Sequence, residues 1–166
     1  MLAYDRFATA IGRITVVMSD KGVCYIGLPN ESLPSVRRWA ARHFSQASLT
    51  VSEAPFEEIR RELEQYAEGR RRTFSFRLDH HNTPFSLRVL EAVSAVPFGR
   101  TTTYRMIARQ VGKPGAARAV GRAVATNPLP LVIPCHRVVG SGGTLTGYGG
   151  GLPLKQALLR MESAAA

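Results

Sequence analysis

The sequence predicts an α/β protein in two parts, a small domain of strands and helices over residues 1–79 and a mostly helical domain over residues 84–166. Runs of β-branched residues with a glycine turn mark the first part, and apolar residues at helical spacing dominate the second. A polar stretch that ends in Pro84 separates the two parts. With 45% hydrophobic residues among 166, the chain can bury a real core, as one domain or two small ones.

Strand signals come first along the chain. Residues 12–19 are rich in β-branched side chains, and Lys21-Gly22 is typical of a turn into residues 23–28. Residues 73–78 alternate between apolar and polar side chains, which predicts an edge strand. The first part is therefore expected to contain a small sheet.

Two helices are expected between these strands. Residues 34–44 carry apolar side chains at helical spacing, and a second amphipathic helix starts near Pro55. No chemistry is evident in this part. Cys24 lies in a predicted strand and is expected to pack, and the adjacent His80 and His81 would point apart in an extended chain, so we expect no metal site there.

The second part is expected to be helical. An apolar helical stripe follows Thr83, its expected N-cap, and a last helix spans about residues 153–162. Between them, helices over residues 104–111 and 116–125 are joined by a tight turn at residues 112–115. Two short helices joined by a glycine turn have the proportions of a helix-turn-helix.

Positive charge is concentrated in the second part. The net charge is +10; residues 1–83 hold twelve basic and ten acidic residues, whereas residues 84–166 hold ten basic residues and only Glu91 and Glu162 as acids. This distribution favours a polyanion-binding face over general solubility, because neutralising phosphates releases counterions. The most basic segment holds seven basic residues and no acid: Arg100, Arg105, Arg109, Lys113, Arg118, Arg122 and Arg137.

The predicted helix over residues 116–125 is poor in long side chains. A helix that reads base edges usually carries Asn, Gln, Arg or Ser, and this one offers only Arg118 and Arg122. A slim helix suits a close, sequence-tolerant approach to the backbone and minor groove of a duplex. Tight packing is the alternative explanation for alanines such as Ala119. Packing explains Arg118 less well, because a cation in the first turn opposes the helix dipole.

Cys135-His136 is the candidate reactive pair. The thiolate is the reactive form of cysteine, and an adjacent histidine is expected to lower the pKa of the thiol. Taken alone, a free cysteine is more often a small buried hydrophobic residue. The residues around Cys135 therefore decide between a packing role and a reactive role. Prolines stiffen a path from Asn127 to Cys135 that is expected to be extended, and the glycine-rich residues 140–151 form either a flexible connector or a pocket wall with Tyr148.

The two cysteines, Cys24 and Cys135, lie far apart and form no C-x-x-C motif. This argues against a disulfide framework and against a cysteine-rich zinc site. The sequence shows neither a signal-peptide pattern at its start nor an apolar run long enough to span a bilayer. We therefore expect a cytoplasmic protein with a reduced Cys135, no membrane partner and no cofactor.

An ordered set of motifs covers essentially all of residues 84–162. The motifs are Pro97-Phe98-Gly99, Thr103-Tyr104, Arg118-Ala119-Val120-Gly121, Asn127-Pro128, Ile133–Val139, Gly147–Leu152 and Leu158-Leu159 with Glu162. In this set the sequence resembles the O6-alkylguanine-DNA alkyltransferases, the methylated-DNA–protein-cysteine methyltransferases. The resemblance implies a ribonuclease H-like N-terminal domain, which the first part matches only in size and character, and a winged-helix-like helix-turn-helix domain at the C-terminus.

The resemblance also implies roles for four residues in the chemistry. Cys135 would accept the alkyl group from guanine O6 irreversibly, in a single turnover. His136, through a water, would take the thiol proton, and Glu162 would orient and stabilise that histidine. Asn127 would help to hold the turn that carries the cysteine.

Further residues are implied on the DNA side and around the base. Arg118 would fill the gap in the stack left by a flipped nucleotide, and Tyr104 would crowd the 3′ phosphate and offer its hydroxyl to the guanine. Gly149 stands where some relatives have serine, and its backbone amide can still reach O6. The implied DNA-binding residues are Thr103, Tyr104, Arg118, Ala119 and Arg122, and the implied pocket residues are Tyr104, Val138, Tyr148, Gly149 and Gly150.

The expected partner is double-stranded alkylated DNA, bound through its minor groove and with self-association along it, and O4-alkylthymine is a further expected substrate. Three alternatives remain at this point. A non-reactive lesion-binding relative would lack the cysteine that is present here as Cys135. A helix-turn-helix regulator would need base-reading side chains on residues 116–125, and a cysteine hydrolase leaves the arginines unexplained.

Overall fold

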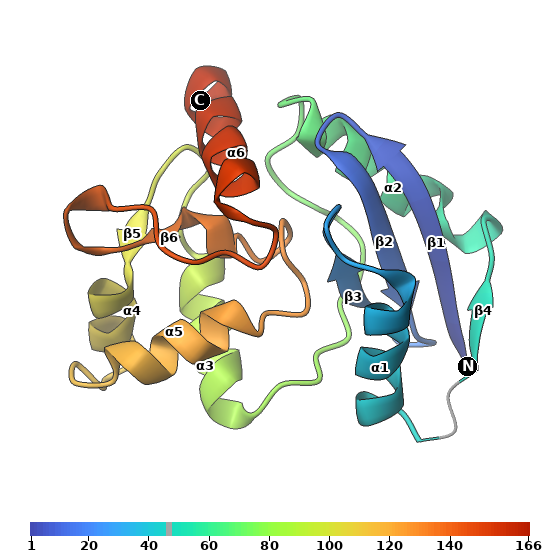
Figure 1. Cartoon of the computed structure of the whole chain (residues 1–166), viewed down its shortest axis with the longest axis horizontal. Helices are drawn as coiled ribbons and strands as arrows, with labels where there is room; N and C mark the ends of the chain where they lie inside the picture. The colour runs from blue at the N-terminus through green and yellow to red at the C-terminus, as the bar shows by residue number, and fades with distance from the viewer. Residues whose placement is uncertain (46–47) are drawn as a thin grey trace. The chain divides into compact units, whose positions relative to one another are not determined.

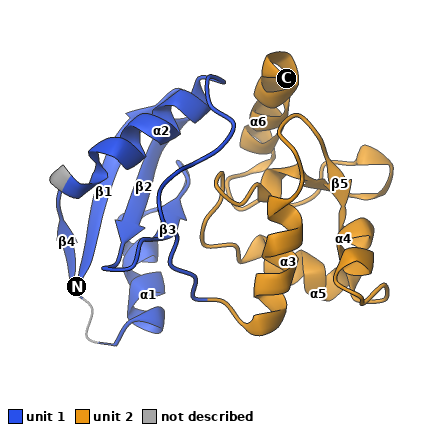
Figure 2. Ribbon diagram, turned by 180° about the vertical axis from the view of Figure 1, so that it is seen from behind, with its two compact units in different colours: residues 1–81 blue, residues 82–166 orange. Residues whose placement is uncertain are grey.

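The computed structural model describes residues 1–45 and 48–166. The chain divides into two compact units, Met1–His81 and Asn82–Ala166, coloured separately in Figure 2. Unit 1 combines a sheet with helices and unit 2 is mostly helical, so the predicted α/β class is confirmed (Figure 1). No helix in the described residues is long and apolar enough to cross a membrane.

Unit 1 is built on a four-stranded sheet. The strands lie in the order β3-β2-β1-β4, with β2 antiparallel to both β1 and β3 and with β4 parallel to β1. Gly12, with a φ of +115°, opens β2 directly after the tight turn from β1, in a conformation that a side chain would strain. The strands are β1 (Leu2–Thr9), β2 (Gly12–Met18), β3 (Val23–Gly27) and β4 (Leu49–Val51).

Two helices pack on this sheet and close its core. In α1 (Leu33–His43) the Ser32 hydroxyl caps the first turn, and Val36 and Ala40 pack with Leu2 and Val17 of the sheet. A 3-10 turn, Ala54–Phe56, leads into α2 (Glu57–Ala67), which buries Ile59, Leu63 and Tyr66. Cys24 is buried in the same core, as expected for a packing residue.

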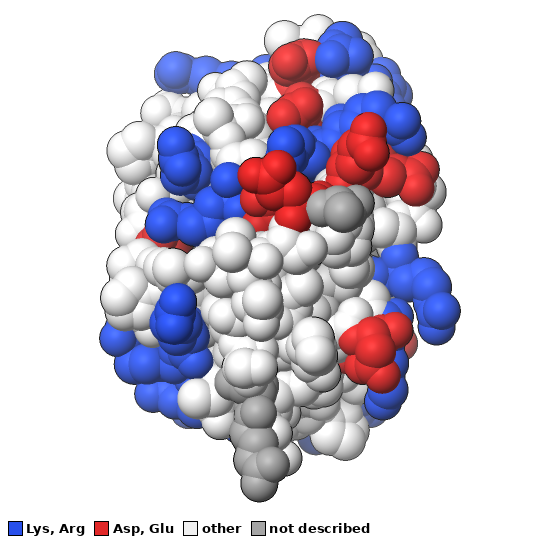
Figure 3. All heavy atoms as spheres, turned by 90° about the vertical axis from the view of Figure 1, so that its right-hand side faces the viewer, with Lys and Arg blue, Asp and Glu red and all other residues white. Residues whose placement is uncertain are grey.

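Charges of both signs are mixed in unit 1. Arg61 pairs with Glu58 on α2, and Arg70 pairs with Glu68 at its end. Figure 3 shows basic and acidic side chains beside one another on the face that carries β4. This mixture matches the small net charge of residues 1–83 and gives unit 1 no single-sign field.

The edge strand predicted over residues 73–78 is absent. Only an isolated bridge joins Leu78 to Val23, although Val23 exchanges backbone hydrogen bonds with Arg77 and Asp79. The reason lies in Glu62 of α2, whose buried carboxylate accepts hydrogen bonds from the backbone and the hydroxyl of Ser75. These bonds hold the segment on the helix and keep it from joining the sheet edge.

Unit 2 packs three helices beside a two-stranded parallel pair. Helices α3, α4 and α5 contact one another, and Thr102-Thr103 of β5 pair with Val138-Val139 of β6. The elements are α3 (Pro84–Ser94), β5 (Thr102–Thr103), α4 (Tyr104–Gln110), α5 (Ala117–Ala125), η2 (Cys135–Arg137), β6 (Val138–Val139), η3 (Ser141–Gly143) and α6 (Leu152–Ala165).

The helix starts in unit 2 follow their threonine caps. Thr83 Oγ1 accepts from the Ser86 backbone at 3.2 Å to begin α3, and Thr103 Oγ1 accepts from the Met106 backbone at 3.2 Å to begin α4. Gly112, with a φ of +75°, makes the turn that leads from α4 towards α5. The α4–turn–α5 arrangement has the expected helix-turn-helix order.

Candidate active site

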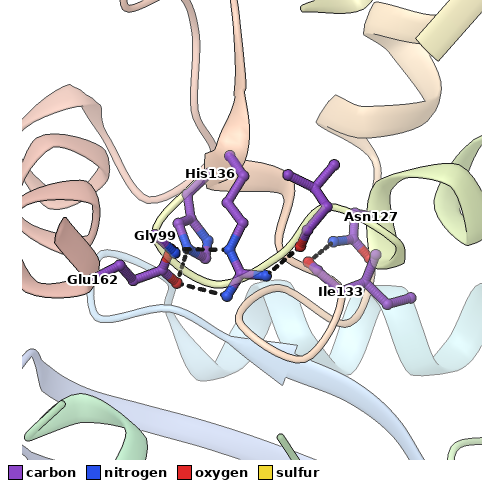
Figure 4. A network of polar contacts seen from close by, with 7 residues as sticks. Gly99, Asn127, Ile133, His136 and Glu162 are labelled. Atoms are coloured by element: carbon purple, nitrogen blue, oxygen red, sulfur yellow. Dashed lines mark hydrogen bonds and ion pairs between the residues drawn. The ribbon is translucent and has the colours of Figure 1, made fainter. Parts of the chain in front are cut away.

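Asn127 holds the turn that leads from α5 to Cys135. Its Nδ2 donates to the Ile133 carbonyl at 3.0 Å (Figure 4). Its Oδ1 accepts from the Leu129 backbone at 3.0 Å. The path is therefore a compact turn, and the prediction of an extended segment is wrong. Leu131 adopts a φ of +73°, which costs about 1–2 kcal/mol for a residue with a Cβ and is held by these bonds.

Cys135 is the first residue of the short helix η2 and is 6% exposed. Burial raises the pKa of its thiol, while a hydrogen bond from Asn127 and the positive charge of Lys155 act in the opposite direction. The expectation of a lowered pKa is wrong, because loss of hydration outweighs the favourable neighbours. The resting thiol is protonated and needs a base to become nucleophilic.

His136 supplies an imidazole in the right state to act as that base. It is fully buried, and its Nε2 lies 2.7 Å from Oε1 of Glu162 on α6 (Figure 4). Burial lowers the pKa of His136, although Glu162 raises it in part. The ring is thus neutral near pH 7, with Nε2–H donating to the carboxylate and with Nδ1 as the basic nitrogen.

Glu162 is held by more than the histidine. Arg137 is 6% exposed and donates from Nε and Nη2 to the two carboxylate oxygens at 2.9 and 2.8 Å. Its Nη1 donates to the Val96 carbonyl at 2.7 Å, and the guanidinium lies over the Phe98 ring. The Gly99 backbone also reaches Glu162, at 3.4 Å. The buried Glu162 carboxylate thereby has hydrogen-bond donors for both of its oxygens.

Arg137 corrects the interpretation of the basic segment. The sequence grouped it with the residues of a polyanion-binding face, but its guanidinium donates hydrogen bonds to Glu162 inside unit 2. The signal that could have revealed this was Glu162 itself. A lone acid in the apolar stripe of the last helix needs a buried counter-charge, and Arg137 adjoins its other partner.

Lys155 is a second site residue that the sequence interpretation missed. Its side chain is fully buried, and Nζ donates to the Val138 carbonyl at 2.7 Å and to the Thr146 carbonyl at 2.9 Å. It thereby ties β6 to the glycine-rich loop. Lys155 lies on the same face of α6 as Leu158 and Glu162, a spacing that could have marked it as inward.

The residues expected on the DNA side lie along the helix-turn-helix. Arg118 and Arg122 of α5 are exposed, whereas Ala119 and Thr103 are half-buried. Tyr104, also half-buried, sits beside Gly121 of α5, and its hydroxyl accepts from Thr146 Oγ1 at 3.4 Å. Tyr104 therefore lies between the slim helix and the glycine-rich loop.

Of the expected pocket residues, Val138 belongs to β6, and Tyr148, Gly149 and Gly150 belong to the glycine-rich loop itself. Val138 is fully buried, Tyr148 and Gly150 are half-buried, and Gly149 is exposed. The Val138 carbonyl accepts a hydrogen bond from Lys155 Nζ. In the described part of the chain, no cluster of three or more His, Cys, Asp or Glu side chains could hold a metal ion.

Fold and site together define a helix-turn-helix protein whose exposed arginine helix lies in the same compact unit as a buried Cys–His–Glu array. Residues 2–80 match the family model for the ribonuclease-like domain of 6-O-methylguanine DNA methyltransferase, and residues 84–164 match the model for its DNA-binding domain. The chain belongs to the 6-O-methylguanine DNA methyltransferase family. The resemblance seen in the sequence, including the ribonuclease-like first domain, is thereby confirmed.

Relatives match along nearly the whole chain. The methylated-DNA–protein-cysteine methyltransferase of Methanosarcina barkeri is 38% identical over 159 residues, which is 96% of this chain and 96% of that protein. The inducible enzyme of Bacillus subtilis is 38% identical over 145 residues, 87% of this chain and 81% of that one. The crystal structure of Mycobacterium tuberculosis OGT in complex with DNA has a TM-score of 0.84 at 35% identity, covering 99% of this chain and 94% of that chain.

Proposed function

We propose that this protein repairs O6-alkylguanine in DNA by moving the alkyl group irreversibly onto its own Cys135, as a methylated-DNA–protein-cysteine S-methyltransferase. The observation that carries the proposal is the buried Cys135–His136–Glu162 array in the same unit as an exposed, arginine-bearing slim helix. The array can generate a thiolate in a site that is shielded from solvent. The helix can bring a nucleic acid to that site.

The chemical step is one in-line displacement. The Cys135 proton passes through a water molecule to Nδ1 of His136, whose Nε2–H remains bonded to Glu162. The thiolate attacks the alkyl carbon, the S–C bond forms as the C–O6 bond breaks, and the electron pair stays on the guanine. The guanine anion then takes up a proton at N1. Glu162 stabilises the imidazolium, and Arg137 keeps that carboxylate ionised.

The target atom is inaccessible inside a duplex, so the nucleotide must leave the stack. We assign the approach to α5, whose Ala and Gly residues allow contact with the minor groove and whose Arg118 is long enough to fill the gap. We assign Tyr104, at the start of α4, to crowding the adjacent phosphate and to the pocket for the base, together with Val138, Tyr148, Gly149 and Gly150. Thr103, Ala119 and Arg122 are assigned to contacts with the DNA backbone.

Three further features belong to the proposal. The Cys135 thiol must stay reduced, which a cytoplasmic location provides. We propose O4-alkylthymine as a second substrate because the same displacement applies to it. Self-association along DNA is expected to give a sigmoidal binding curve on long duplexes and a hyperbolic curve on duplexes that hold one molecule.

Incubation with a duplex oligonucleotide that contains O6-methylguanine is expected to shift the Cys135 peptide by the mass of one methyl group. Peptide mass spectrometry reads the site, and one equivalent of the oligonucleotide is expected to exhaust the protein, because a thioether is a poor leaving group. Cys135→Ser is the matched control and should remain unmodified. Multiple turnover, or a methyl group on Cys24, would contradict the mechanism.

Arg118→Ala is expected to slow reaction with the duplex by on the order of 10- to 100-fold, because an unfilled stack leaves the few kcal/mol of extrusion uncompensated. Reaction with free O6-methylguanine base, which needs no extrusion, should change little. Single-turnover rates on both substrates give the comparison. Arg88→Ala, which removes an exposed charge from α3, controls for general electrostatics. Equal losses on both substrates would exclude the gap-filling role.

A further inference from the structure

Tyr148 presents a buried hydroxyl that protein groups leave unsatisfied. Its ring is half-buried, but Oη is shielded from solvent, and within the described residues no hydrogen-bond partner reaches it. Buried hydroxyls are normally paired, and an unpaired one in a native structure calls for an explanation. Lining a pocket wall requires only the ring, so it leaves the hydroxyl unexplained.

The loop holds this ring in a fixed place. The Gly151 backbone donates to the Tyr148 carbonyl at 2.9 Å, and the Lys155 backbone donates to Gly151 at 3.1 Å. Before Tyr148 in the sequence, the Thr146 carbonyl accepts from Lys155 Nζ at 2.9 Å. Both anchors belong to α6, the helix that also carries Glu162. The hydroxyl is therefore positioned by the same element as the carboxylate that orients His136.

The hydroxyl belongs to the same neighbourhood as the reacting groups, because Lys155 Nζ donates both to the Thr146 carbonyl, two residues before Tyr148, and to the Val138 carbonyl, three residues after Cys135. Burial raises the pKa of Tyr148, and the negative charges of Cys135 and of Glu162 raise it further. The phenol therefore stays neutral throughout the working pH range and keeps its proton as a hydrogen-bonding group. A neutral hydroxyl close to both the thiol and the carboxylate is suited to binding a small polar molecule between them.

We infer that Tyr148 is a positioning residue whose hydroxyl is the third hydrogen-bond partner of the water that carries the Cys135 proton to His136. This inference rests on the proposed function. A buried water typically makes about three hydrogen bonds. Here the thiol donates to the water, the water donates one proton to His136 Nδ1, and its second proton bonds to Tyr148 Oη. No bond to Tyr148 is made or broken, and the proton balance of the displacement is unchanged.

The competing role for the hydroxyl is a contact to the guanine. The two roles differ when no base is present, because a water relay acts on the thiol alone. The rate of Cys135 alkylation by iodoacetamide, followed by peptide mass spectrometry without DNA over a range of pH, therefore reports the relay. Single-turnover methyl transfer from an O6-methylguanine duplex reports the complete reaction.

Tyr148→Phe keeps the ring and removes only Oη. At pH 7 we expect both reactions to slow by about tenfold, a part of the 10²–10⁴-fold that a positioned base contributes. The difference should vanish at a pH high enough to ionise the thiol without a base. The thermal unfolding midpoint should not fall, because Oη bonds to no protein group among those described. Tyr4→Phe, in β1 of unit 1, is the matched control and should match the wild type in all three measurements.

Each outcome separates the alternatives. If Tyr148→Phe leaves the iodoacetamide profile unchanged and slows only the duplex reaction, the hydroxyl serves the guanine and the relay role is overturned. The relay role is likewise overturned if neither rate changes. If the wild type fails to take a methyl group from the duplex while its iodoacetamide profile still depends on Tyr148, the proposed function fails and the relay stands.

Discussion

Glu162→Gln is expected to lower the free energy of unfolding by about 3–5 kcal/mol, because the buried guanidinium of Arg137 loses its counter-charge. The amide also places donor hydrogens against the donors of His136 and Arg137. His136 then loses the acceptor that sets its tautomer, so methyl transfer should slow by at least about 10²-fold. Urea unfolding and single-turnover transfer measure the two effects.

Glu91→Gln is the matched control for this change. Glu91 is the other acid of residues 84–166, it is exposed, and its replacement should alter stability by less than about 0.5 kcal/mol. The double variant Glu162→Gln with Arg137→Met removes both buried charges. It should recover part of the stability without recovering transfer, because His136 still lacks its carboxylate. Equal stability of the Glu162→Gln and Glu91→Gln proteins would show that the buried pair is not coupled to folding.

Lys155→Met is expected to slow methyl transfer by on the order of 10- to 100-fold, because β6 and the glycine-rich loop lose the cation that ties them together. Two carbonyls lose charge-assisted bonds, but an ammonium whose pKa is lowered by burial is also removed. These effects oppose each other, so stability should fall by only about 1–3 kcal/mol.

The loop is where the Lys155→Met effect should be visible. Hydrogen exchange is expected to speed up in residues 140–151 while the amides of α3 keep their protection. Arg160→Met, an exposed site on the same helix, provides the control for loss of one positive charge. A slow reaction combined with unchanged exchange in the loop would show that Lys155 acts on the chemistry directly and does not act through loop position.

Much of unit 2 could be predicted because its boundaries are local. Thr83 and Thr103 cap the helices that follow them, and Gly112 takes the positive φ that ends α4. Each of these signals depends on a few neighbouring residues, so the local structure that it predicts does not depend on long-range contacts. The site could be predicted from the family resemblance, which implies Cys135, His136 and Glu162 as a set.

Long-range pairing explains what sequence reasoning missed. Residues 73–78 have a strand pattern, but the Glu62 carboxylate holds Ser75 on α2 instead. Arg137 is of a residue type that commonly binds phosphate, and only its bond to Glu162 shows that its side chain is buried inside unit 2. The direction of the Cys135 pKa likewise depends on burial, which the adjacent histidine in the sequence does not reveal.

The short ladder between β5 and β6 has a consequence for how a lesion can be reached. Thr103 ends β5 and caps α4, whereas Val138 begins β6 directly after the helix that carries Cys135. The start of the helix-turn-helix and the segment that carries the nucleophile are therefore joined by one pair of hydrogen-bonded strands. This pairing restricts how far the thiol can move away from the helix-turn-helix. The nucleotide must therefore move out of the duplex to reach the thiol, so the ease with which a given base pair opens should govern which lesions are repaired first.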